Sequence, residues 1–236
     1  MCAYSGISQD SLFLLKINIF NDSKAFYEEN KEKIKQGVTV PMRQIAAALS
    51  DDMLDIDPMM NTIPTKMVSR VRRDTRYTKD KRLYRENMWI MFMRPKHEWR
   101  MYPCMWFEVT PKSWFCGVGN YDAPAELMEI FRRHLVERKD EFFEAVKSAE
   151  STGARYRAEL YRRSKPNCPD GLEQYYNAKY FCFIFESADM DMLSDEKIIE
   201  DIRKKYKKFA PMYNFLKDVS DEYVSKGGNF DELHEI

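Results

Sequence analysis

Strand-like segments are gathered in the middle of this chain, with helical segments before and after them. Runs rich in β-branched and aromatic residues occur at 67–77, 84–94, 101–110, 114–118, 156–161 and 180–185. Helices are expected at 26–35, where opposite charges lie three or four residues apart, and at 41–54, 124–135, 141–149 and from 194 onward. Because strands and helices do not alternate strictly, the pattern predicts an α+β fold: a central, mostly antiparallel sheet with N-terminal, middle and C-terminal helices packed on it.

Glycine and proline set the expected boundaries between these segments. Gly37 is expected to break the first helix, and Pro41 is expected to lie in the first turn of the next one. A turn at Pro111-Lys112-Ser113 predicts an aromatic hairpin. Pro211 is expected to kink or end the last helix. No repeat or long linker interrupts residues 1–236, so one domain is predicted.

The balance of charge argues against a general attraction to polyanions. The chain has 38 Lys and Arg residues against 38 Asp and Glu residues, a formal net charge of zero. The net charge therefore does not favour binding to nucleic acid or to an anionic membrane. A local basic patch is still compatible with a net charge of zero. The five cysteines lack a C-x-x-C spacing, which is typical of reduced thiols in the cytoplasm. The first residues do not have the pattern of a signal peptide, and no membrane association is expected.

The densest cluster of charge lies at residues 70–85. If the first half of this segment is a strand, period two places one set of side chains on each face. One face carries Arg70, Arg72, Asp74 and Arg76. The other carries Val71, Arg73, Thr75 and Tyr77, so that Arg73 is expected to be partly buried beside a carboxylate.

The same segment resembles the central motif of the domain of unknown function 2461 family, R-D-x-R-F-x-x-D-K-x-P-Y-K. Residues 73–81 follow that motif, and Leu83 stands where the family has proline. Phe26, Asn30 and Lys31 resemble the N-terminal W-F-x-x-N-K stretch of the family, and Gly117 and Gly119 stand where its glycine-rich turn precedes a helix. The resemblance implies a fold shared over nearly the whole chain. It implies no agreed reaction, cofactor or catalytic residue.

Two interpretations of the charged segment compete. In the first, an anion site is built by Arg72, Arg76 and Lys81, since guanidinium groups bind phosphate and carboxylate bidentately. In the second, Asp74 and Asp80 neutralise neighbouring arginines in a structural ion-pair network, and this second interpretation is the one favoured.

The Gly117-Val118-Gly119 segment also has two interpretations. A helix beginning at Pro124 suggests a phosphate site at a helix N-terminus, but no Lys-Ser or Lys-Thr pair follows the glycines as in a phosphate-binding loop. A tight turn requiring positive φ is the favoured interpretation.

Histidine and aromatic residues give no chemical signature. His97, His134 and His234 lack ligand spacing, so no metal site is predicted, and His134 is expected to be a satisfied histidine at the edge of the core. The aromatic residues between 99 and 115 suit either core packing or a surface on which bases stack. Packing is favoured for them: Trp99, Tyr102, Trp106, Phe107, Trp114 and Phe115.

The function predicted from these patterns is the binding of a small ligand that carries phosphate or carboxylate, in a cytosolic domain. Its residues are expected to be Arg72, Arg73, Arg76, Lys81, Tyr84, Gly117 and Gly119. If the domain is an enzyme, Asp74 or Asp80 is the nearby candidate for proton transfer. No cofactor is predicted. The rival hypothesis is a non-enzymatic module that contacts protein or nucleic acid, in which the charged motif is structural.

Overall fold

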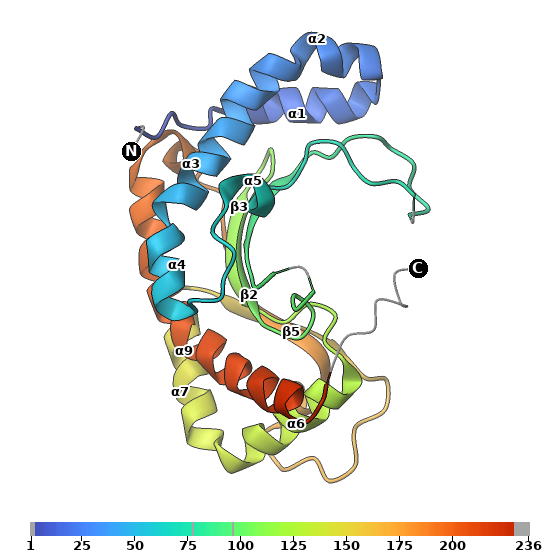
Figure 1. Cartoon of the computed structure of the whole chain (residues 1–236), viewed down its shortest axis with the longest axis vertical. Coiled ribbons are helices and arrows are strands. Elements are labelled where there is room, and N and C mark those ends of the chain that lie inside the picture. The colour runs from blue at the N-terminus through green and yellow to red at the C-terminus, as the bar shows by residue number, and fades with distance from the viewer. Residues whose placement is uncertain (1–2, 77, 96, 229–236) are drawn as a thin grey trace.

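The computed structural model describes residues 3–76, 78–95 and 97–228 (Figure 1). Its sheet has five strands in the order β1-β2-β3-β5-β4, and every neighbouring pair is antiparallel. The strands are β1 (Met88–Phe92), β2 (Cys104–Val109), β3 (Trp114–Gly119), β4 (Arg155–Leu160) and β5 (Ala178–Ser187). With helices at the beginning, middle and end of the chain, this confirms the predicted α+β class.

The N-terminal part of the chain is helical. Its helices are α1 (Gln9–Asn21), α2 (Lys24–Ile34), α3 (Val40–Ala48), α4 (Ser50–Ile56) and α5 (Pro64–Met67). Ser8 and Ser23 cap the first two helices by accepting hydrogen bonds from backbone N–H groups. Pro41 lies in the first turn of α3, as predicted.

Gly37 does not break the helix, contrary to the prediction. The chain continues from α2 into α3 through a π-helical turn, Lys35–Thr39. A Cβ atom at position 37 would lie 2.8 Å from the Cβ of Ser11 on α1. Glycine is therefore required here by the close approach of two helices, and the sequence alone does not distinguish this from a helix end.

The remaining helices cover one face of the sheet. They are α6 (Ala125–Glu137), α7 (Lys139–Glu150), α8 (Glu173–Tyr176) and the long α9 (Lys197–Ser225), which is preceded by a 3-10 turn at Asp191–Ser194. Helix α9 continues through Pro211 rather than ending there, and Figure 1 shows its orange and red halves running in different directions. A bend of this kind is expected where proline removes a backbone donor inside a helix. Among the described residues, no helix has the length and hydrophobicity needed to cross a membrane.

The core lies between the sheet and these helices. Alternate residues of β3 (Trp114, Cys116 and Val118) point into it, and each is at most 1% exposed. Aromatic rings of four elements meet there, with centroid distances of 5.0–6.3 Å between Phe131, Phe142, Phe181 and Phe215. Because the helices cover this face only, the opposite face of the sheet is open, on the right in Figure 1.

The strand predicted at residues 67–77 is not formed by its described residues, since Met67 ends α5 and the described part of 68–87 has no regular strand. Two isolated bridges, Val68 to Ile90 and Arg72 to Tyr84, hold the segment as an irregular arm (Figure 1). Among its described residues, Val68, Val71 and Tyr84 are buried and apolar, and most of its other side chains are charged or polar, so it offers little apolar surface to a third strand. A lone two-stranded ribbon is marginal. Tyr77, assigned to this strand from the sequence, lies outside the described residues.

Candidate functional site

A groove of about 1700 Å³ occupies the open face of the sheet. Its floor is formed by β1, β2, β3 and β5, and its walls by the segments around residues 59–70, 93–100 and 119–121. The floor is mainly apolar or aromatic, with Glu108 as its charged residue, and most polar and charged side chains belong to the walls. An apolar pocket with a smaller number of polar groups is typical of ligand sites. The lining of the floor is Trp89, Met91, Cys104, Trp106, Glu108, Gly119, Tyr180, Cys182 and Ile184.

Strand alternation explains why these residues face the groove. Residues opposite each other in an antiparallel pair point to the same face. One row across the sheet therefore consists of Met91, Trp106, Gly117 and Ile184, and it continues to Arg155 on the edge strand β4. The next row is Cys104, Gly119, Cys182 and Arg157.

The two glycines of β3 leave space for neighbouring groups in the middle of the sheet. A Cβ atom on Gly117 would lie 2.6 Å from both the Trp106 ring and the carbonyl oxygen of Phe183. A Cβ atom on Gly119 would lie 2.6 Å from the Cα of Cys182. The prediction of a tight turn with positive φ at these glycines was wrong, since both lie inside β3 and neither has positive φ. Their role is close packing of neighbouring strands.

Aromatic residues close one end of the groove. The rings of Trp99 and Tyr121 are stacked, with centroids 6.0 Å apart, and the Tyr180 ring lies 6.3 Å from that of Tyr121. The guanidinium group of Arg100 lies 4.9 Å from the Trp99 ring. Tyr121 is 62% exposed, so this end presents aromatic surface to solvent.

Two thiols lie in the floor on either side of Gly119. Burial raises the pKa of Cys104 to about 12. Burial also raises the pKa of Cys182 to about 11, while the nearby charge of Arg157 acts in the opposite direction. Both groups are therefore protonated at neutral pH and are poor nucleophiles. They contribute polarisable apolar surface to the groove.

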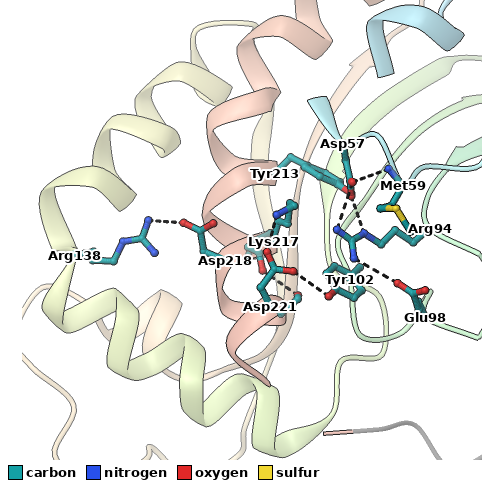
Figure 2. Close-up of polar contacts among 12 residues, drawn as sticks. Asp57, Met59, Arg94, Glu98, Tyr102, Arg138, Tyr213, Lys217, Asp218 and Asp221 are labelled. Atoms are coloured by element: carbon teal, nitrogen blue, oxygen red, sulfur yellow. Dashed lines mark hydrogen bonds and ion pairs between the residues drawn. The ribbon is translucent and has the colours of Figure 1, made fainter. Parts of the chain in front are cut away.

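A buried ion pair supports the wall beside β1 (Figure 2). Arg94 donates from Nε to Asp57 at 2.8 Å, and the same carboxylate accepts a hydrogen bond of 2.7 Å from the Tyr213 hydroxyl on α9. Burial raises the pKa of Asp57, but the hydrogen bonds from Arg94, Met59 and Tyr213 outweigh burial and hold it below its usual value. The charge of Arg94 is thus committed to the fold although the residue lines the groove.

The same figure shows how the segment after Arg94 is attached to α9. Tyr102 donates a 2.9 Å hydrogen bond to Asp221, and its ring lies 3.7 Å from the Arg94 guanidinium. Arg94 also reaches Glu98 at 3.4 Å. These contacts fix the segment that carries Trp99 and Arg100 at the end of the groove.

Two cationic side chains at the rim of the groove, unlike Arg94, are not paired with a described carboxylate. Lys66 and Arg70 line the groove, are exposed, and form no ion pair with any described residue. The carboxylate of the groove lining, Glu108, accepts a 2.7 Å hydrogen bond from Asn87. The rim therefore offers positive charge to a ligand that lies on the floor.

The predicted arginine site lies instead on the arm. Arg73 is paired with Asp80, which confirms its expected partial burial beside a carboxylate at 22% side-chain exposure. Asp80 also accepts from Arg82, and Arg76 pairs with Asp74 at 2.7 Å. Lys81 donates to the Thr75 carbonyl oxygen at 2.8 Å. Arg72 is exposed at the bridge to Tyr84.

The arm is anchored at its base rather than at its tip. Tyr84 is 2% exposed and stacks on Tyr27 of α2, with ring centroids 4.8 Å apart. The Leu83 N–H group donates to the Asp22 carboxylate at 2.7 Å. Of the residues predicted to bind a ligand, Gly119 alone is in the groove lining, and the arm residues are brought together with one another instead.

The arm carboxylates are held ionised. Hydrogen bonds from the Arg76 side chain and backbone lower the pKa of Asp74 to about 2. Hydrogen bonds from Arg82 and Arg73 lower the pKa of Asp80 well below its usual range. A carboxylate so strongly held is a weak proton acceptor at neutral pH, so their role in proton transfer stays a prediction that the electrostatics do not favour.

Histidine takes the structural role expected of it. His134 is 8% exposed, and its Nε2 lies 2.7 Å from Glu222 on α9. Among the described residues, no three His, Cys, Asp or Glu side chains are grouped as metal ligands would be. His234 lies outside the described residues.

Sequence reasoning missed most of the groove residues. Trp89, Met91 and Ile184 lie in strands that were correctly placed, but no sequence signal showed which face of the sheet the helices would cover. The aromatic set divides between the two faces: Phe107 and Trp114 are buried in the core, while Trp99 and Trp106 line the groove. The alternation of side chains along each strand shows which residues share a face. It does not show which of the two faces the helices cover.

Comparison with known proteins agrees with the resemblance seen in the central motif. The family described as Conserved hypothetical protein (DUF2461) matches residues 11–215, which includes the arm, the whole sheet and most of α9. No curated protein matches the chain. The chain belongs to the DUF2461 family of conserved hypothetical proteins.

Proposed function

We propose that the groove binds an anionic ligand with an apolar, flat body. The observation that supports this most is the pairing of an aromatic floor with uncommitted cations at its rim. Trp89 and Trp106 supply aromatic surface, and Lys66 and Arg70 supply charge without a carboxylate partner among the described residues. An apolar body would be held by burial, and the anionic group by the rim.

This proposal keeps the anionic ligand predicted from the sequence but moves its site from the arm to the groove. Arg73, Arg76 and Arg82 of the arm form ion pairs with Asp74 and Asp80, and these carboxylates neutralise part of the positive charge of the arm. A location in the cytoplasm is part of the proposal, and it is supported by free thiols at Cys104, Cys116, Cys168 and Cys182.

The test compares two probes that differ in one charged group. 1-Anilinonaphthalene-8-sulfonate carries the sulfonate, and N-phenyl-1-naphthylamine has the same rings without it. Both fluoresce on entering an apolar site, so both affinities come from titration of the folded protein. We expect both to bind, the sulfonate more tightly.

Charge variants locate the anionic group. Arg70→Gln is expected to weaken the sulfonate by about tenfold, equivalent to one charge-assisted contact, and to leave the neutral probe unchanged. Lys112→Gln removes an exposed lysine from the β2–β3 turn, outside the groove lining, and serves as the matched control. Equal affinity of the two probes, or equal effects of the two variants, would contradict a rim that selects anions.

A further inference from the structure

The open face of the sheet carries cations along both edges, not only beside β1. Arg155 and Arg157 on the edge strand β4 lie opposite Ile184 and Cys182, so they point to the same face as the groove floor. Both are exposed, and neither forms an ion pair with a described residue. Lys66 and Arg70 hold the corresponding position at the other edge.

Between these two edges the floor offers aromatic rings. Trp89 forms a cation–π contact with Arg85, whose guanidinium group lies 4.4 Å from the centroid of the Trp89 ring. Trp106 extends over Gly117 in the middle of the sheet, and Phe115 faces the same side by strand alternation. The stacked pair of Trp99 and Tyr121 continues the aromatic surface at one end.

The arm adds charge on the same side of the molecule. Residues 68–87 contain eight Arg and Lys residues against three acidic residues, Asp74, Asp80 and Glu86. Figure 1 shows the arm extending on the side toward which the open face of the sheet is turned. Ion pairs with Asp74 and Asp80 neutralise only part of this charge.

The chain has a net charge of zero because acidic residues elsewhere balance the basic residues of the arm and the sheet edges. Acidic residues collect on the helical side, between α4 and the start of α9. That set is Asp51, Asp52, Asp55, Asp195, Glu196 and Glu200. Lys197 and Arg203 pair with three of them and leave the set with an excess of negative charge. Electrostatic attraction depends on where charge lies, so zero net charge does not exclude a basic region at the edges of the open face. Two carboxylates of that face, Glu108 and Glu186, lie in the row of Phe115, away from the row of Cys182 and Arg157.

We propose that the ligand of the groove is a single-stranded nucleic acid. Its bases would lie on the aromatic floor, and its phosphates would meet the cations of the two edges and the arm. This inference rests on the proposed function, because it names the ligand class of the same groove. A duplex hides its base faces in its own stack and does not suit an aromatic floor. An acidic peptide matches the charge but has no rings to place on Trp89 and Trp106.

The experiment measures fluorescence anisotropy of a labelled oligothymidylate of about 12 nucleotides, beginning at about 50 mM salt. The test variant is Arg155→Gln with Arg157→Gln. The control variant, Lys207→Gln with Lys208→Gln, removes two exposed cations from α9. Each phosphate contact to a single strand contributes about 0.7 to the slope of log affinity against log salt. We expect the test variant to flatten the slope by about 1.4 and the control to leave it unchanged.

Results of three kinds would overturn the inference. The first is absence of oligothymidylate binding while the naphthalene sulfonate still binds, which leaves the proposed function intact. Failure of both ligands would instead remove the proposed function itself. The second is equal binding of the same strand annealed to its complement, or an equal slope change in the control, which means charge alone is recognised. The third is displacement of the strand by an oligoglutamate of equal length at similar concentration, which means that the bases do not contribute to binding and that an acidic chain fits the groove as well.

Discussion

The ring of Trp106 on β2 lies over Gly117 on β3, in the space that the Cβ atom of any other residue at position 117 would enter. This relationship gives the groove its floor, because the indole can extend across the sheet only where the neighbouring strand has no side chain. It also shows why the glycines of β3 belong to a strand rather than a turn.

Gly117→Ala is therefore expected to destabilise the protein by about 1–3 kcal/mol, as overpacked cores do. The new methyl group would meet both the indole and the Phe183 carbonyl oxygen. Combining it with Trp106→Ala should give no full rescue of the Gly117 clash, because the carbonyl stays in place. Chemical denaturation of both variants beside Trp106→Ala measures this. Gly117→Ala with wild-type stability would show that the strands can separate at no cost.

The buried pair of Asp57 and Arg94 should matter more than the exposed pairs of the arm. Asp57 is fully buried, and the Arg94 side chain is 10% exposed. Arg94→Met is expected to cost about 3–5 kcal/mol, because it leaves an uncompensated buried carboxylate. Glu98→Gln, which removes the charge from a 3.4 Å contact to the same arginine and from an exposed contact to His97, is the control and should cost less than about 1 kcal/mol. Similar losses in both variants would show that Asp57 is not the main partner.

The same carboxylate predicts a pH dependence. The folded pKa of Asp57 lies below its usual value, so its stabilising effect is complete above that usual value, near 4, and is lost as the pH falls through the folded pKa. The difference in unfolding free energy between wild type and Asp57→Asn should stay constant from pH 7 to about 5 and shrink below about 4. Denaturation at a series of pH values measures it. A difference that already shrinks near pH 6 would mean that burial dominates and raises the pKa.

The arm should tolerate loss of its exposed arginines but not of its anchor. Arg72→Ala and Arg76→Ala are expected to shift the thermal midpoint by less than about 2 °C, since exposed ion pairs contribute little. Tyr84→Ala removes a buried ring stacked on Tyr27 and should cost about 3–5 kcal/mol. Scanning calorimetry separates the two outcomes. A large drop for both arginine variants would make the charged motif a structural network of the fold.

Local sequence signals located most of the fold. The hairpin of β2 and β3, the helix after Pro124 and the apolar strand around 180–185 follow directly from turn residues and periodicity. The errors lie where tertiary contacts override local preference: Gly37 is set by the approach of α1, and residues 68–76 lack a partner strand. The groove was not predictable for the same reason, since the covered face of the sheet is chosen by α6, α7 and α9, which are distant in sequence from Trp89 and Trp106.

The most direct test of the account places a charge in the middle of the groove floor. Ile184 lies between Gly117 and Arg155 in the row across the sheet, and Leu160 on β4 is 48% exposed outside the groove lining. Titration with the naphthalene sulfonate is compared for Ile184→Glu and Leu160→Glu, with thermal unfolding confirming that each variant is folded. The account predicts at least about tenfold weaker binding for Ile184→Glu and wild-type binding for Leu160→Glu. Equal binding by the two folded variants would contradict the assignment of the open sheet face as the binding site.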